Sequence, residues 1–310
     1  MIALLLFGIA GFIAQVIAGA LGMGYGMIST TVLIAVGTAP AVASAAVHFA
    51  QVGTAIASGA AHWKFRNVDW RTVGILAVPG AIGAVLGAFA LVAMATNVAR
   101  VWITSFLFLL GLYVLIRFAF LKAGKLITEK RPGAKMLAPL GLVAGFMDAS
   151  GGGGWGPVAT TTLLSSGRLE PRKVVGSVSA SEIVVATAAC VAFVIALKHE
   201  GMNWLVVLGL MIGGILGAPF GAWMAHRLPP RVLGTAAGSL ILLANAWMVL
   251  ELVGMPRPLI IASYVGLIGF LVYAMISAVR AMREEKRVNE LAGEDDPDPD
   301  SDREKASELS

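Results

Sequence analysis

The chain has 310 residues, of which 58% are hydrophobic and 13% charged, and its mean hydropathy is +0.84. Such values exceed those of soluble domains, and apolar runs of about 20 residues recur along the chain. The formal net charge of +5 comes from basic residues that punctuate these runs without clustering, so the composition predicts an all-α, multi-pass membrane protein and argues against nucleic acid as a partner.

A glycine-rich stretch from Asp148 to Pro157 has a counterpart 130 positions earlier. At this offset, four residues of the first copy align with four of the second: Gly22, Gly24, Tyr25 and Gly26 with Gly152, Gly154, Trp155 and Gly156. Further along, at an offset of 134, Trp70, Gly80, Gly83 and Gly87 align with Trp204, Gly214, Gly217 and Gly221. The sequence therefore contains an internal duplication.

In the first copy, the apolar pieces 1–21 and 27–36 flank the glycines. As a helix, 24–37 would reach about 20 Å, short of the roughly 30 Å hydrocarbon core. We therefore expect a broken-helix hairpin that dips to the midplane, with full spanning as the alternative. Three spans follow, at 41–61, 72–95 and 100–121. The second copy repeats this plan with a hairpin at 136–166 and spans at 173–197, 203–225 and 231–250.

A last apolar run, 259–279, has no partner in the duplication and precedes a cluster of basic residues at 280–287. The positive-inside rule places this end in the cytoplasm and, counting back through the basic loops, the N-terminus in the periplasm. Each copy then contains an odd number of crossings, so the copies form inverted repeats, as in many secondary transporters. The expected organisation is a first transmembrane repeat (1–122), a cytoplasmic linker (123–135), a second repeat (136–253), an additional C-terminal transmembrane helix (254–280) and a disordered acidic cytoplasmic tail (281–310).

Two acidic residues, Asp148 and Glu182, fall well inside apolar runs. An ionised carboxylate at the bilayer centre costs about 2.5 to 3.5 kcal/mol on insertion scales, so such residues are usually paired, protonated or exposed to a polar cavity. Both are candidates for proton coupling. The alternative is a structural hydrogen bond, which for Asp148 would cap the glycine turn.

Glu182 aligns with Gln51, and Ser179 aligns with His48. Residues three apart share a helix face, so each copy presents a polar pair, and pseudo-twofold symmetry would bring both pairs towards one central region. A packing role is the alternative for an intramembrane histidine. The other histidines, His62, His199 and His226, lie at predicted span ends and are expected to be interfacial.

The glycine turns allow sharp bends and close approach of a ligand to the backbone. Pro157 suits the first position of a helix, which would aim free N–H groups at the midplane and favour an anion. Gly83-x3-Gly87 and Gly213-x3-Gly217-x3-Gly221 are more typical of helix packing. The candidate substrate-binding residues are Gly22, Gly24, Tyr25, Gly26, His48, Gln51, Gly152, Gly153, Gly154, Trp155 and Ser179.

Motifs of other functional classes are missing from the sequence. Neither glycine cluster continues into the Lys-Ser/Thr of a phosphate-binding loop, and there is no His-Glu-x-x-His. The single cysteine, Cys190, cannot form a multi-cysteine metal site. We expect no catalytic residues, no metal and no cofactor.

The duplicated pattern resembles the sulfite exporter TauE/SafE family of bacterial membrane transporters over roughly residues 8–275. The glycine-rich turn, a proline about fourteen residues on, the polar first full span and the Trp70 loop carry the resemblance, each repeated in the second half. The resemblance implies secondary transport that exports a small anion, such as sulfite or the organosulfonate sulfoacetate, across the bacterial inner (plasma) membrane. A passive anion channel and an intramembrane enzyme using His48, Asp148 and Glu182 are the alternatives. The expected partners are a small anion and the lipid bilayer, while protons and a second copy in a homodimer are left open.

Overall fold

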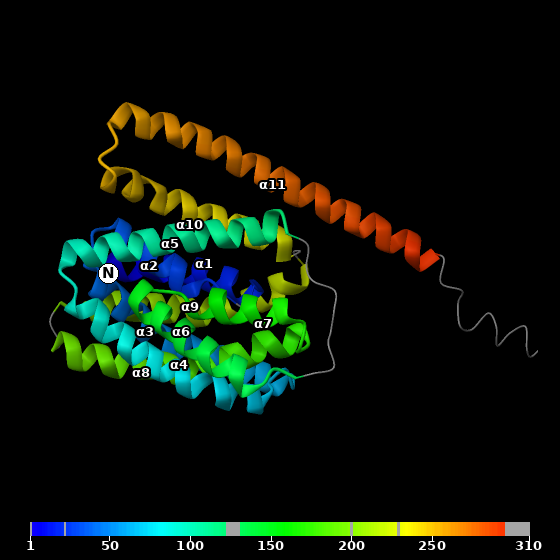
Figure 1. The fold of residues 1–310 in the computed structure, drawn as a ribbon, viewed down its shortest axis with the longest axis horizontal. Helices are drawn as coiled ribbons and strands as arrows, with labels where there is room; N and C mark the ends of the chain where they lie inside the picture. Colours follow the sequence, from blue (N-terminus) through cyan, green and yellow to red (C-terminus); the bar gives the residue numbers. More distant parts are fainter. Residues whose placement is uncertain (1, 22, 122–130, 199–200, 228–229, 295–310) are drawn as a thin grey trace, which may run out of the picture.

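The computed structural model describes residues 2–21, 23–121, 131–198, 201–227 and 230–294, and it contains helices but no strand within these ranges (Figure 1). Seven of the described helices are long and apolar enough to cross a membrane. These helices are α3 (Pro40–Lys64), α4 (Trp70–Ala93), α5 (Thr96–Ala119), α8 (Pro171–Leu197), α9 (Trp204–Arg227), α10 (Pro230–Leu252) and α11 (Arg257–Glu294). The prediction of an all-α, multi-pass membrane protein is confirmed.

Two broken helices precede the spans of the two copies. The first consists of α1 (Ile2–Leu21) and α2 (Tyr25–Ala35); the second consists of α6 (Ala134–Gly151), the π-helical turn η1 (Gly156–Thr160) and α7 (Thr161–Ser166). At 1.5 Å per residue, the 11 residues of α2 reach about 17 Å, too short to cross the hydrocarbon core. Proline occupies the start of α3, α8 and η1, where its missing N–H costs no helical hydrogen bond.

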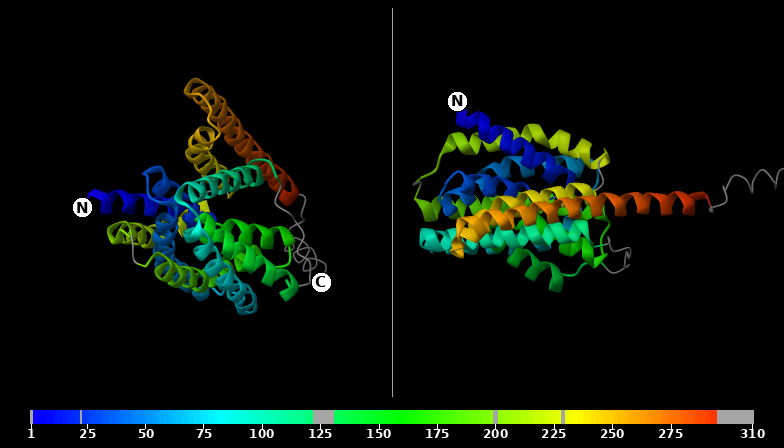
Figure 2. Two further views of the ribbon diagram at one scale, coloured as in Figure 1. Left: turned by 60° about the vertical axis from the view of Figure 1, so that its left-hand side comes forward. Right: turned by 90° about the horizontal axis from the view of Figure 1, so that it is seen from above.

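Helices pair across the two copies. The most extensive contacts join α1 to α9, α4 to α6, α5 to α10 and α3 to α8. In the duplication, α1 corresponds to α6, α3 to α8, α4 to α9 and α5 to α10, while α2 corresponds to η1 and α7. The α1–α9 pair is therefore equivalent to the α4–α6 pair. The first helix of each copy thus packs against the other copy, and the two copies form one bundle (Figure 2).

Small residues make this close packing feasible. A Cβ at Gly83 of α4 would fall against the backbone of Leu142 in α6, and one at Gly217 of α9 would lie 2.6 Å from the carbonyl oxygen of Phe12 in α1. The glycines that the sequence assigns to packing therefore lie at the α4–α6 and α1–α9 contacts, where van der Waals contact between backbones replaces side-chain packing.

Basic connections gather at one end of the bundle, which we call the basic end. The backbone N–H of Asp69, between α3 and α4, donates to Ser177 Oγ near the start of α8 at 2.9 Å. Arg231, at the start of α10, donates from Nη2 to the carbonyl oxygen of Leu121 beyond α5 at 3.2 Å. The connections that carry Lys64, Arg168 and Arg231 therefore lie together.

The last helix differs from the sequence-based expectation in its length. α11 packs mainly on α10 at the edge of the bundle and continues to Glu294, past the expected boundary at 280 (Figure 1). Residues 281–292 contain neither glycine nor proline and are rich in strong helix formers, which accounts for the continuation. The remainder of the expected acidic tail, 295–310, lies outside the described residues.

Replacement of Gly83 by leucine tests the packing of α4 on α6. We expect Gly83→Leu to lower the free energy of unfolding by about 3 kcal/mol, the upper range for overpacking, because the α6 backbone leaves no space. Gly74→Leu, on the same helix but with nothing near its Cβ position, should unfold at the wild-type temperature or above it. Thermal unfolding in mild detergent measures both. An equal loss of thermal stability in Gly83→Leu and Gly74→Leu would contradict the close packing of α4 on α6.

Candidate functional site

The two glycine turns meet near the middle of the bundle. Three glycines adopt positive-φ conformations that favour glycine. They are Gly24 (φ 114°), which precedes α2, and Gly152 (φ 76°) and Gly153 (φ 152°), which follow α6. The Thr30 hydroxyl of α2 donates to the carbonyl oxygen of Gly152 at 2.5 Å. A Cβ at Gly26 would lie 2.8 Å from the Gly153 Cα atom, so the turns touch with no room for side chains between them.

Asp148, in the last turn of α6, stabilises the second turn. Its Oδ1 atom accepts a hydrogen bond from the backbone N–H of Trp155 at 2.9 Å, and its Oδ2 atom lies 3.2 Å from His48 Nε2 of α3. The carboxyl and the imidazole are almost completely buried, at 1% and 0% exposure. The structure thus shows the capping contact that was the structural alternative for Asp148, and it adds a pairing with His48.

The hydrogen bonds of His48 determine the charge of this pair. His48 Nδ1 lies 2.7 Å from the carbonyl oxygen of Ser44, and because a carbonyl only accepts, Nδ1 must carry a hydrogen. The contact between Nε2 and Oδ2 then holds one proton, either on the imidazole or on the carboxyl. In both cases the pair has zero net charge, which suits a site inside the bilayer.

Gln51 and Glu182, which align in the duplication, meet directly. Gln51 Nε2 of α3 donates to Glu182 Oε1 of α8 at 2.9 Å. The Gln51 Oε1 atom is buried without a hydrogen-bond partner in the described structure. Gln51 and Glu182, one member of each expected polar pair, therefore approach each other, whereas His48 lies against Asp148.

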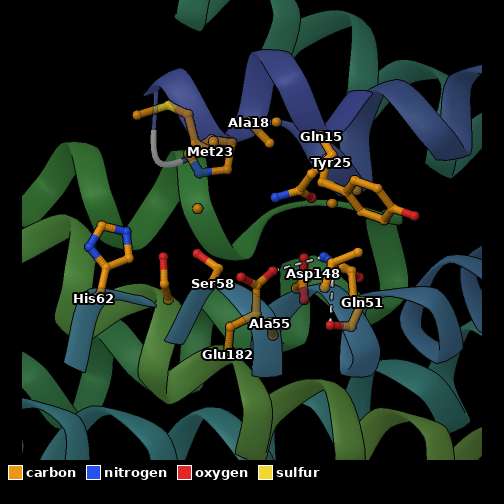
Figure 3. Close-up of a pocket in the computed structure, with 18 residues that line it drawn as sticks. Gln15, Ala18, Met23, Tyr25, Gln51, Ala55, Ser58, His62, Asp148 and Glu182 are labelled. Carbon is orange, nitrogen blue, oxygen red and sulfur yellow. Dashed lines mark hydrogen bonds between the residues drawn. The ribbon is translucent and has the colours of Figure 1, made fainter. Parts of the chain in front are cut away.

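A small cavity of about 50 Å³ lies where these groups converge (Figure 3). It has room for a few water molecules or an anion of a few atoms. Eight of the residues selected from the sequence line it: Gly24, Tyr25, Gly26, Gln51, Asp148, Gly153, Ser179 and Glu182. His48, Gly152, Gly154 and Trp155 are outside the lining, and Gly22 lies outside the described residues.

The aromatic residues of the two turns are each anchored by a hydrogen bond and by packing over a glycine. The Tyr25 hydroxyl donates to the carbonyl oxygen of Leu210 at 2.9 Å, and Trp155 Nε1 donates to that of Val178 at 3.1 Å. Each ring also packs over a glycine of the opposite copy, Tyr25 over Gly214 and Trp155 over Gly80, and these glycines align with each other. Tyr25 forms part of the cavity wall, whereas Trp155 is buried behind it.

Several lining residues were missed from the sequence: Gln15 of α1 and Thr54, Ser58 and His62 of α3. The α3 residues follow Gln51 at helical spacing, a signal that was present in the sequence, but His62 was interpreted as interfacial because it lies in the last turn. None of the described lining residues is Lys or Arg. Across the described ranges, no three His, Cys, Asp or Glu side chains are placed to hold a metal ion.

A multi-pass helical bundle with a small polar cavity at the junction of two broken helices is the architecture of a membrane transporter. The family model of the sulfite exporter TauE/SafE matches residues 7–248, and the chain belongs to this family. The chain is 50% identical over 244 residues to the probable membrane transporter protein YtnM of Bacillus subtilis (strain 168), a match that covers 78% of this chain and 81% of that relative. No solved structure matches the chain.

The His48–Asp148 pair can be tested by a double-mutant cycle. We expect His48→Ala and Asp148→Ala each to lower the free energy of unfolding by about 3 to 5 kcal/mol, because each leaves a buried polar partner alone. The double variant should lose less than the sum, by about 1 to 3 kcal/mol. Ser179→Ala, which removes a hydroxyl from the cavity wall but no charged partner, should be within about 0.5 kcal/mol of wild type. Additive losses would show that the pair does not interact.

Proposed function

We propose that this protein is a secondary transporter that exports a small anion of the sulfite and organosulfonate class, such as sulfite or sulfoacetate, across the bacterial inner (plasma) membrane. The observation that carries the proposal is the cavity at the contact of the two glycine turns. Membership of the TauE/SafE family supports the substrate class.

The cavity offers the groups that a small anion needs. Gly24, Tyr25 and Gly26 line it at the start of α2, where the first N–H groups have no partner within the helix and the positive end of the helix dipole lies. Hydroxyl groups of Ser58 and Ser179 add hydrogen-bond donors from α3 and α8. A volume of about 50 Å³ admits only a compact anionic group.

Glu182 is the residue that we propose for proton coupling. Asp148 is already engaged by His48 and by the N–H of Trp155, whereas Glu182 accepts a hydrogen bond from the neutral Gln51 and borders the cavity. A negative carboxylate would repel an anion in the same cavity, so we propose that Glu182 holds a proton while the anion is bound and releases it to one side of the membrane. Outward movement of one negative charge is itself favoured by about 2.3 kcal/mol per 100 mV, so coupling would regulate export more than drive it.

We further propose that the basic end faces the cytoplasm and that the N-terminus faces the periplasm, in keeping with the positive-inside rule. The two copies would then act as inverted repeats that rock about the shared site. The equivalent α1–α9 and α4–α6 contacts support this arrangement, because each copy contributes its first helix to the other.

Reconstitution into proteoliposomes tests this proposal. Vesicles loaded with unlabelled sulfite should take up labelled sulfite transiently above its equilibrium level, because a carrier exchanges substrate at one alternating site. The rate should saturate with sulfite concentration. A passive channel would give linear flux without counterflow, and the absence of flux for sulfite and sulfoacetate would refute the substrate class.

In vesicles loaded with sulfoacetate, which stays fully ionised near neutral pH, Glu182→Gln should retain counterflow but lose the pH dependence of net transport, because glutamine keeps the hydrogen bond and cannot titrate. Glu170→Gln, an exposed change at the basic end, is the matched control and should keep the wild-type pH profile. If Glu182→Gln also keeps that profile, Glu182 is a structural hydrogen-bonding residue.

A further inference from the structure

A line of polar side chains runs along one face of α3 from the site to the basic end. Gln51, Thr54, Ser58 and His62 are spaced by three or four residues and all line the cavity (Figure 3). Gln51 and His62 are eleven residues apart, which corresponds to about 16 Å along the helix. The cavity therefore extends from the junction of the glycine turns to the last turn of α3.

The equivalent face of α8 is apolar. At the offset of 131 that aligns Gln51 with Glu182, Thr54, Ser58 and His62 correspond to Val185, Ala189 and Phe193. All three α8 side chains are buried and none lines the cavity. Phe193 packs against the His48 ring, with centroids 5.8 Å apart. Within the described residues, the polar lining of the cavity thus continues along α3 towards the basic end and not along the equivalent face of α8.

His62 lies at the mouth of this path with an unused nitrogen. Its Nδ1 atom is buried and has no hydrogen-bond partner in the described structure. Among the described residues that line the cavity, it is the one side chain that can carry a positive charge. The other titratable groups of the lining, Tyr25, Asp148 and Glu182, lie deeper, and two of them are acids (Figure 3). An anion that approaches from the basic end meets His62 first.

We propose that His62 recruits the anion at the cavity mouth and determines the charge selectivity of the α3 path. The imidazole donates a hydrogen bond to the anionic group and, when protonated, supplies a positive charge at the mouth of a cavity whose described lining contains no Lys or Arg. The sulfonate or sulfite group would pass from His62 to Ser58 and then to the junction of the turns. This inference rests on the proposed anion transport, but its first test does not depend on transport.

The first test measures charge selectivity by thiol modification. A cysteine at Ser58, on a Cys190→Ala background, is reacted with an anionic and with a cationic methanethiosulfonate. We expect the ratio of the anionic to the cationic rate to fall about tenfold in His62→Gln and to persist in His62→Lys. A cysteine at Ala189, the aligned and buried α8 position, is the control and should react with neither reagent.

Two outcomes would overturn the inference. An unreactive cysteine at Ser58 would show that the path does not open at the basic end. An equal rate ratio in wild type, His62→Gln and His62→Lys would show that His62 exerts no charge selectivity.

The second test uses sulfite transport. His62→Gln should raise the KM for sulfite applied at the basic end about tenfold while the maximal rate remains near that of wild type, because only recruitment is lost. His62→Lys should restore the KM, and His62→Phe, which copies the aligned Phe193, should close the mouth and abolish transport. If wild type transports sulfite and His62→Gln has an unchanged KM, His62 has no role in recruitment. Wild type could also transport neither sulfite nor sulfoacetate while the ratio of the anionic to the cationic thiol-modification rate still depends on His62. In that case the substrate proposal fails and the charge selectivity of the path stands.

Discussion

The contact between the two glycine turns is the constraint on which the rest of this structure depends. Gly26 and Gly153 approach so closely that a single added Cβ would overlap the opposite backbone, and the Thr30 hydroxyl joins the turns by a hydrogen bond. This contact lets both broken helices end at one point in the bundle. It also brings α3 and α8 close enough for Gln51 to reach Glu182. The cavity is the space left between these elements.

Electrostatics inside the bilayer explains why the two buried acids differ in their surroundings. Asp148 is neutralised by His48 within a pair that holds one shared proton. Its other carboxyl oxygen accepts the hydrogen bond from the backbone of Trp155 that stabilises the second glycine turn. Glu182 has an uncharged amide as its partner and borders the cavity. We therefore propose a positioning role for Asp148 and a role in proton exchange for Glu182.

Much of this arrangement could be predicted from the duplication in the sequence. Helical spacing and the aligned positions indicate the approach of Gln51 to Glu182, and short apolar pieces beside the glycines indicate the broken helices. The His48–Asp148 pair could not be predicted, because His48 aligns with Ser179 and Asp148 aligns with Ala18, so neither residue points to the other. The place of His62 in the last turn of α3 predicts an interfacial side chain but not a cavity, and only the three-dimensional packing shows that the cavity reaches it. The inverted orientation of the two copies stays a prediction.

The central claim is that a small anion binds at the junction of the glycine turns. Crystals soaked in selenite, an electron-dense analogue of sulfite, would test it most directly through anomalous diffraction. The account predicts an anomalous peak in the cavity bordered by Gly26, Gln51, Gly153 and Glu182. The apolar hollow on the opposite side, lined by Phe7, Leu33 and Val206, should hold none. A peak in that hollow, with none between the turns, would contradict the assignment of the site.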